Sequence, residues 1–222
     1  MSHVATQKHN LHKALLTWYR HNARDLPWRT TSDPYAILVS EVMLQQTQVA
    51  RVVPKYHLFL QRFPSLNALA KSPRSEVIRV WGPLGYNVRA VYLHELAQQV
   101  VHIYEGQLPR EVAELRRLPG LGRYTAAAIA SLAYGKDVAV VDTNVRRILT
   151  RLFTRNSNLR ENEIWKLDQT IAPSGRTASW NQALMDLGAT VCLKSQPDCY
   201  LCPLKPYCKP AHVLEGNGNN LA

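Results

Sequence analysis

Four cysteines near the C-terminus constrain this chain more than any other feature. The first ten residues are polar and lack the apolar stretch of a secretory signal, so disulfides are not expected. Four thiolates in one short loop suit a tetrahedral zinc ion or a four-iron, four-sulfur cluster. Only one spacing is as short as a zinc knuckle, so the spacing C-x6-C-x2-C-x5-C favours the cluster. The residues concerned are Cys192, Cys199, Cys202 and Cys208.

The charge of the chain points to a polyanionic partner. Lysine and arginine number 27 against 16 aspartates and glutamates, a formal net charge of +11, and cations that neutralise phosphates release condensed counterions. Charge alone does not exclude a basic protein with no nucleic-acid role.

The 222 residues are enough for one globular unit or two small ones around a shared cleft. No apolar run is long enough to span a membrane, so we expect a cytoplasmic protein without membrane contact.

Apolar residues recur at helical spacing through nearly the whole chain. Within 9–22, for example, they include Leu11 and Leu15. Asp33 followed by Pro34 resembles an N-cap with proline at the first helical position. No sustained alternation typical of strands occurs. We therefore predict an all-α fold, with helices over 9–22, 35–48, 53–62, 66–70, 75–80, 89–104 and 112–117.

A glycine pair marks a tight turn in the segment 118–124, whose sequence is LPGLGRY. Gly120 and Gly122 allow another backbone to come close, and a run of small residues begins a helix directly after them. The free amides at a helix start form an anion site suited to a phosphate. An isolated Gly-x-Gly is more often an ordinary turn. Here the preceding apolar helix, Pro119 and the basic chain favour the phosphate site.

Asp142 ends the apolar run that begins at Val138 and precedes a helical segment. Most aspartates in this position only cap the helix, and we expect Asp142 to do so. A second interpretation is a carboxylate kept ionised in a cleft.

Glu41 lies within a strongly apolar predicted helix and is followed by the polar sequence Gln45-Gln46-Thr47-Gln48. Burial raises the pKa of a carboxyl group, which is what a general acid requires. For an isolated glutamate, a solvent-facing position would be the better interpretation. The amides beside it are unusual for a core helix and suit hydrogen bonds to base edges.

The hairpin, the aspartate, the glutamate and the cysteine loop together resemble, in order and spacing, the helix-hairpin-helix DNA glycosylases that carry a cluster loop. The resemblance covers about residues 26–208. Within that superfamily the run EVMLQQTQ is similar to the MutY-type adenine glycosylases. Their pattern is also matched by PWR at 27–29, GY at 85–86, RA at 89–90 and MDLGA at 185–189. The cysteine loop matches the family's pattern, so the resemblance implies a [4Fe-4S] cluster rather than zinc.

The resemblance also implies a mechanism. Double-stranded DNA with a mismatched or damaged base pair would be the partner of a monomeric, nucleoid-associated enzyme. The base would be flipped into a pocket between two helical domains. Glu41 would protonate adenine, and Asp142 would stabilise the sugar cation. Tyr124 stands where bifunctional relatives carry a Schiff-base lysine, which implies a monofunctional enzyme. The DNA-contacting residues implied are Gln45, Gln46, Thr47, Asn87, Arg89, Leu118, Gly120, Gly122 and Arg123.

The expected organisation has two helical subdomains flanking the DNA-binding and base-flipping cleft. Residues 31–136 would form a six-helix domain containing the hairpin. Residues 1–30 together with 137–211 would form the cluster domain, and 212–222 a disordered tail.

Three features depart from the adenine-glycosylase pattern. Thr143 stands where that family usually has glycine, Asn87 where it commonly has tyrosine, and the C-terminal domain that reads 8-oxoguanine is not expected in this chain. The archaeal thymine mismatch glycosylase also lacks that C-terminal domain and also has tyrosine at the position of Tyr124, so the chain resembles it in both features. Adenine opposite guanine or 8-oxoguanine is the leading substrate, because Glu41 supplies the proton that a departing purine needs. Thymine or uracil opposite guanine is the alternative, and a catalytically silent DNA-binding module is a remote third.

Overall fold

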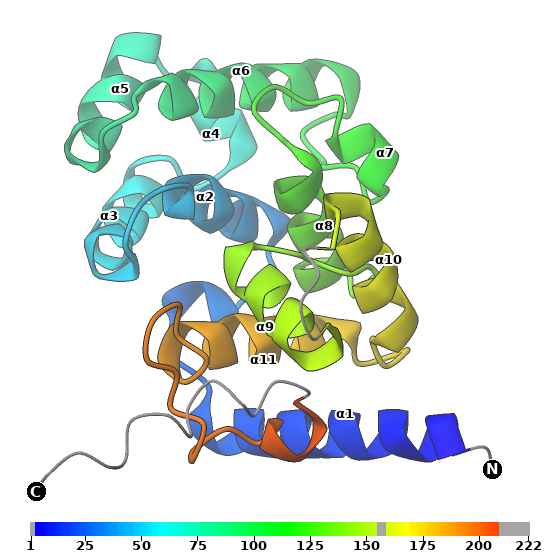
Figure 1. Cartoon of the computed structure of the whole chain (residues 1–222). Helices are drawn as coiled ribbons and strands as arrows, with labels where there is room; N and C mark the ends of the chain where they lie inside the picture. The colour runs from blue at the N-terminus through cyan, green and yellow to red at the C-terminus, as the bar shows by residue number, and fades with distance from the viewer. Residues whose placement is uncertain (1–2, 155–158, 209–222) are drawn as a thin grey trace, which may run out of the picture. The chain divides into compact units, whose positions relative to one another are not determined.

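The computed structural model describes residues 3–154 and 159–208, which form eleven α-helices and three short 3-10 helices without a strand (Figure 1). The predicted all-α class is confirmed. The chain divides into two compact units, Asp25–Lys136 and Met1–Arg24 with Asp137–Ala222. Each unit has its own apolar core and is described by itself below. The expected tail at 212–222 lies outside the described residues.

A central helix organises the unit Asp25–Lys136. Helix α2 (Pro34–Leu44) is buried over nearly its whole length and packs against α3, α6 and α8. Its start follows the predicted signal, because the Asp33 side chain accepts a hydrogen bond from the Tyr35 amide at 3.0 Å and Pro34 occupies the first turn. The other elements of this unit are η1 (Pro27–Arg29), α3 (Val49–Arg62), α4 (Leu66–Lys71), α5 (Arg74–Trp81), η2 (Gly82–Leu84), α6 (Val88–Ile103), α7 (Val112–Leu115) and α8 (Arg123–Leu132).

Helix α2 ends at Leu44, so the prediction that it continues to residue 48 is wrong. Gln45 leaves the helical conformation with φ −57° and ψ 114°, and Gln46 has φ +52°, in the left-handed region. The side chain of Arg89 donates to the carbonyls of Val42 and Met43 in the last turn of α2. These carbonyls lack partners within the helix end, and the guanidinium satisfies them. The glutamine-rich sequence is therefore a loop.

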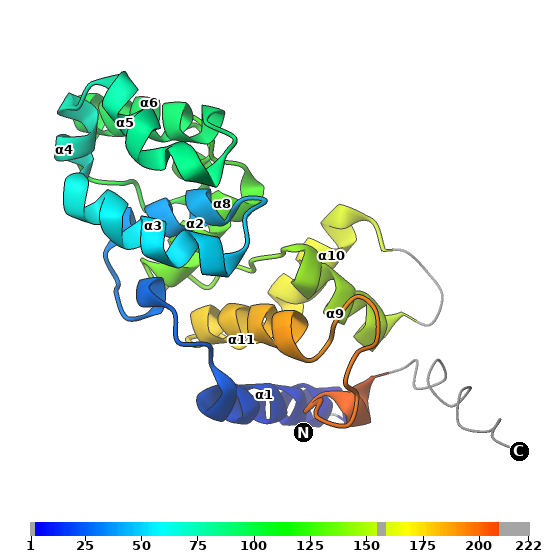
Figure 2. The ribbon, with the colours of Figure 1, turned by 90° about the vertical axis from the view of Figure 1, so that its left-hand side faces the viewer.

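The unit Met1–Arg24 with Asp137–Ala222 is built around α11 (Thr177–Thr190), which packs against both α1 (His3–Asn22) and α9 (Thr143–Phe153). Figures 1 and 2 show α11 lying between these two helices. Helix α10 (Glu161–Ile171) packs against α9, and the 3-10 helix η3 (Lys205–Tyr207) lies in the cysteine-rich segment.

A buried carboxyl group joins α10 to α11 in this core. Asp168 is fully buried, and its Oδ1 accepts a hydrogen bond from the Trp180 indole at 2.9 Å. Its Oδ2 has no hydrogen-bond partner among the described residues. Burial raises the pKa of Asp168 to about 7, against the smaller lowering effect of the Trp180 hydrogen bond. On α1, His12 places its ring edge-on to Trp180, so the three helices meet at this point.

None of the described helices is both long enough and apolar enough to cross a membrane.

Candidate active site and cysteine loop

The predicted general acid Glu41 lies on the buried helix α2 and is only 5% exposed. Four residues later, directly after the end of α2, is Gln45, whose side-chain amide donates to the Thr125 hydroxyl at 3.3 Å. Thr125 belongs to the first turn of α8, directly after Tyr124. The geometry thus brings the end of α2 to the start of α8. Gln46 is exposed, whereas Thr47 is half-buried.

The hairpin forms as predicted, as a turn that leads into α8. Gly120 has φ +75°, and a Cβ built on it would lie 2.8 Å from the Tyr92 Cβ, so only glycine allows this contact with α6. Gly122 is the N-cap of α8 and is exposed, with open space at the position that a Cβ would occupy. Leu118 is 3% exposed and anchors the hairpin in the core. Arg123 at the helix start is half-buried, and Asn87 at the start of α6 is exposed.

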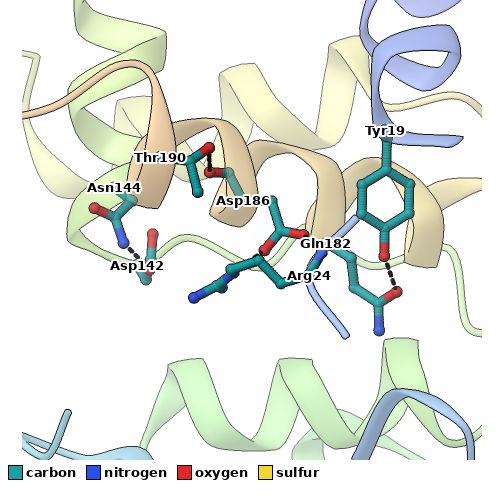
Figure 3. A network of polar contacts seen from close by, with 7 residues as sticks. All are labelled: Tyr19, Arg24, Asp142, Asn144, Gln182, Asp186 and Thr190. Atoms are coloured by element: carbon teal, nitrogen blue, oxygen red, sulfur yellow. Dashed lines mark hydrogen bonds and ion pairs between the residues drawn. The ribbon is translucent and has the colours of Figure 1, made fainter. Parts of the chain in front are cut away.

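Asp142 caps α9, which confirms the predicted capping role. Its Oδ1 accepts a hydrogen bond from the Val145 amide at 2.7 Å. Its Oδ2 accepts a second bond from the Asn144 side-chain amide at 3.0 Å, drawn in Figure 3. Both carboxylate oxygens therefore have fixed directions, while the side chain as a whole is only half-buried. A carboxylate held in this way is suited to face a developing positive charge.

A chain of hydrogen bonds connects this carboxylate with the cysteine loop. Arg147 on α9 donates to the Asn144 side-chain oxygen at 2.9 Å and to the Gly188 carbonyl at 2.6 Å. Its Nε donates to the Cys192 carbonyl at 2.8 Å. One guanidinium thus holds the residue that orients Asp142, the end of α11 and the first cysteine.

Figure 3 also shows how α11 is attached to the end of α1. The buried Asp186 carboxylate accepts from the Arg24 backbone amide at 3.0 Å and from its Nε at 2.5 Å. Tyr19 donates to the Gln182 side chain at 2.8 Å one turn earlier. These contacts fix the helix that carries Gly188 and leads into the cysteine loop.

The four cysteines are half-buried free thiols gathered in one segment. Burial raises the pKa of the Cys202 thiol to about 11, and the proximity of the other three cysteines adds to this effect. Arg151 on α9 donates to the Cys192 sulfur at 3.2 Å and to the Leu193 carbonyl at 2.7 Å. Across residues 3–154 and 159–208, no group of three or more His, Cys, Asp or Glu side chains is placed to hold a metal ion. The four thiols of this segment are nevertheless the type of donor that a four-iron cluster uses.

The structure gathers the candidate residues into two groups. Gln45, Thr47 and Arg89 meet at the end of α2 in one unit, which also holds Glu41, Tyr124 and the hairpin. Asp142 and the cysteine loop belong to the other unit. Asn144 and Arg147 are not predicted as site residues by the sequence, although both follow Asp142 in the same helix, and Gly188 enters only through the MDLGA match. The available signal was their polarity at helix positions two and five residues after a candidate carboxylate.

Residues 39–170 match the HhH-GPD superfamily of base excision DNA repair proteins. The match covers more than half of the chain, which therefore belongs to this superfamily.

Relatives within the superfamily are named for different bases. The chain is 42% identical over 215 residues to the adenine DNA glycosylase of Homo sapiens, covering 91% of this chain and 39% of that protein. It is 40% identical over 201 residues to the adenine DNA glycosylase of Buchnera aphidicola subsp. Baizongia pistaciae, covering 89% and 57% respectively. The chain thus spans about two fifths to three fifths of the length of these relatives. It is also 36% identical over 198 residues to the thymine/uracil-DNA glycosylase of Methanothermobacter thermautotrophicus, covering 87% and 90%.

Solved structures give the same fold. A thermostable thymine-DNA glycosylase matches with a TM-score of 0.87 and 34% identity, covering 94% of this chain and 98% of its own. A trapped covalent complex of endonuclease III with DNA matches with a TM-score of 0.80 at 24% identity, covering 94% and 97%. The second comparison supports the fold alone.

Proposed function

We propose that this protein is a monofunctional DNA glycosylase of base excision repair that removes adenine mispaired with guanine or 8-oxoguanine. The observation that carries the proposal is Glu41, a carboxyl group 5% exposed on an apolar helix that leads directly into the Gln45–Thr47 loop. A buried acid beside hydrogen-bonding amides is what excision of a purine requires. The identity of 40–42% to adenine DNA glycosylases supports the same base.

In the proposed reaction, duplex DNA binds to a monomer and the mispaired adenine leaves the base stack. Glu41 donates its proton to a ring nitrogen of adenine, so that the electron pair of the breaking glycosidic bond stays on a neutral base. The ionised Asp142 stabilises the positive charge that develops on the sugar. Water then adds to the sugar carbon and loses a proton, which leaves an abasic site and free adenine.

Tyr124 supports a reaction that stops at base removal. Strand cleavage by bifunctional glycosylases passes through a Schiff base, which needs an amine. The phenol at position 124 has none. The hairpin 118–123 would hold a phosphate through the amides at the start of α8, with its position fixed by the Gly120–Tyr92 contact.

The same proposal assigns the cysteine loop to a [4Fe-4S] cluster with Cys192, Cys199, Cys202 and Cys208 as ligands. The chemistry of the donor set fits, since this segment supplies four free thiols and Arg151 donates a hydrogen bond to the sulfur of Cys192. When bound, the cluster would template the loop. Arg147 and Arg151 attach that loop to α9, and so to Asp142.

Excision of thymine or uracil opposite guanine is the second candidate. The specific observation in its favour is the thymine/uracil-DNA glycosylase relative, 90% of whose length is matched by this chain. Thymine departs as an anion and needs hydrogen-bond donors more than an acid, so the buried Glu41 favours adenine.

An alkaline nicking assay separates these candidates. Duplexes that carry A:G, A:8-oxoguanine, G:T or G:U pairs are incubated with the protein, and alkali then cleaves each abasic site. Cleavage at adenine supports the proposal, and cleavage at thymine or uracil alone replaces it with the second candidate. Absence of cleavage on all four duplexes indicates a DNA-binding module without activity.

A further inference from the structure

In the loop after α2 and in the loop before α6, one residue each adopts a backbone conformation that residues other than glycine rarely adopt. Gln46 has φ +52° and Tyr86 has φ +48°. Both side chains are exposed, Tyr86 to 64%. Left-handed conformations of such residues are unfavourable and persist only where the surrounding structure holds them.

One buried side chain holds both loops. Arg89, on α6, is 7% exposed. Its Nη1 donates to the carbonyl of Gln45, directly before Gln46. Its Nη2 donates to the carbonyl of Gly85, directly before Tyr86, at 3.1 Å. The two strained residues are therefore each fixed at the preceding peptide by the same guanidinium.

Further contacts fix the guanidinium itself. Nη1 also donates to the last-turn carbonyls of α2, and Nη2 donates to the Thr47 hydroxyl at 3.1 Å. The guanidinium carbon lies 5.3 Å from the centre of the Trp81 ring and 5.6 Å from that of Tyr86. The Trp81 indole donates to the Gly85 carbonyl at 3.2 Å, so this carbonyl has two donors. With its Nη atoms committed inside the protein, Arg89 has little surface left for DNA.

We propose that Arg89 is a positioning residue that holds the exposed side chains of Gln46 and Tyr86 in the orientations in which they meet the duplex. The proposal rests on the function proposed above and replaces direct contact of Arg89 with DNA. The planar guanidinium fork reaches both loops at once, and a lysine ammonium cannot reproduce that geometry. Arg89 therefore acts through the two loops, and both loops respond when it is changed.

Hydrogen exchange of the free, full-length protein tests this directly. The variants are Arg89→Lys and Arg89→Met, with Arg74→Met as the control. Arg74 lies in the same unit and hydrogen-bonds Glu95 on α6 at 3.0 Å, away from both loops. In both Arg89 variants, amides of residues 46–48 and 86–88 should exchange about tenfold faster or more. The hairpin amides 118–123 and the control should keep wild-type rates.

The functional readout is discrimination between duplexes. Misplaced contact residues should lower affinity for the mismatched duplex and single-turnover excision by about tenfold to a hundredfold. Affinity for a fully paired duplex, which depends on phosphate contacts, should change less than about twofold. The Lys variant, which keeps the charge, carries the test where the Met variant does not fold.

Two results would overturn the proposal. Unchanged exchange in both loops would show that Arg89 does not hold them, and equally faster exchange throughout α2 and α6 would show a general role in core stability. If the wild type excises no base from any mismatch, the proposed function fails, while the exchange data still decide whether Arg89 holds the loops.

Discussion

Gly188 on α11 lies so close to Asn144 on α9 that a Cβ built on the glycine would be 2.5 Å from the Asn144 Cβ. The same Cβ would lie 3.2 Å from the Asn144 Cα, so a side chain at position 188 would displace the backbone of Asn144 as well as its side chain. The Asn144 side chain also donates a hydrogen bond to Oδ2 of Asp142. Helix packing and the direction of the proposed catalytic carboxylate therefore depend on the same glycine.

Gly188→Ala should consequently lower both the free energy of unfolding and the rate of excision, and the variant should stay folded while excision is impaired. We expect overpacking to lower the free energy of unfolding by about 1–3 kcal/mol. Single-turnover excision should fall about tenfold or more, because Asp142 loses its alignment. Gly82→Ala is the control, since no atom lies within 4 Å of a Cβ at that position. If folded Gly188→Ala protein excises the base at the wild-type rate, the contact between Gly188 and Asn144 does not contribute to catalysis.

The buried Asp168 should make stability depend on pH. Its pKa is raised from 3.8 to about 7 in the folded protein, so the folded state binds a proton that the unfolded state releases between these values. Its contribution to stability is fully present below pH 4 and is lost as the pH rises through 7. Asp168→Asn removes the titration. Relative to wild type, its free energy of unfolding should rise by about 2–3 kcal/mol from pH 5 to pH 8, measured by urea unfolding.

Asp137 provides a control of opposite sign. It is exposed, and hydrogen bonds from Ser174, the Gly175 amide and Thr177 lower its pKa. Its contribution is present above its unfolded pKa and is lost as the pH falls through the folded value. Asp137→Asn should therefore have a lower free energy of unfolding than wild type at neutral pH, and the difference should become smaller in acid.

For Asp168, a free energy of unfolding that changes with pH in the same way in Asp168→Asn and in wild type would show that this residue does not titrate between pH 5 and pH 8.

The parts of the fold that were predictable are those set by neighbouring residues. Asp33 with Pro34 and Asp142 before α9 are local caps, and both occur as the sequence indicated. The apolar run of α2 likewise predicted a buried helix, since few polar residues interrupt it. Position 41 could be placed in the core on this ground.

The parts that were missed depend on contacts between distant positions. Helix α2 ends early because Arg89, 44 residues further along the chain, holds the Gln45 carbonyl. Arg147 contacts Cys192 across 45 residues. A helical period read over a short window contains neither interaction, so the glutamine loop was predicted as helix and the link from α9 to the cysteine loop was not seen.

Binding to undamaged duplex should be largely electrostatic. With a net charge of +11, affinity should fall by about tenfold or more between low and physiological salt. Gly122→Asp should weaken binding further, because its carboxylate enters open space at the start of α8, where the proposed phosphate binds. Gln61→Asp adds the same charge at an exposed position of α3 and should have little effect. Filter binding across a salt series measures both, and equal effects of the two variants would count against the hairpin site.

The absence of an amine at position 124 should limit the enzyme to base removal. Borohydride should trap no abundant covalent adduct with DNA in the wild type. Tyr124→Lys should gain measurable strand cleavage and trapping, because an amine then replaces the phenol at the start of α8. Tyr124→Phe is the control and should trap nothing. Strong borohydride trapping of DNA by the wild type, through a lysine elsewhere in the chain, would reject the monofunctional assignment.

The two carboxylates should fail in different ways when they are replaced. Glu41→Gln keeps the shape of the side chain but cannot deliver a proton. Mismatched duplex should therefore bind nearly normally, while excision falls by about a hundredfold to ten-thousandfold, the usual contribution of a positioned acid.

Asp142→Asn removes the negative charge that would face the sugar cation, and the loss of excision should be at least comparable, because such electrostatic stabilisation is usually the largest single contribution. Affinity should be kept or increased, since the asparagine no longer repels phosphates. Asparagine can still accept the Val145 amide bond that caps α9, so unfolding should change by no more than about 1 kcal/mol. The double variant should be little worse than either single one, because both groups act in one transition state. Single-turnover excision, duplex affinity and urea unfolding of the three variants give the complete comparison. If Glu41→Gln excises at nearly the wild-type rate, Glu41 is not the general acid and is only a buried residue of α2. If Asp142→Asn is also active, Asp142 only caps α9.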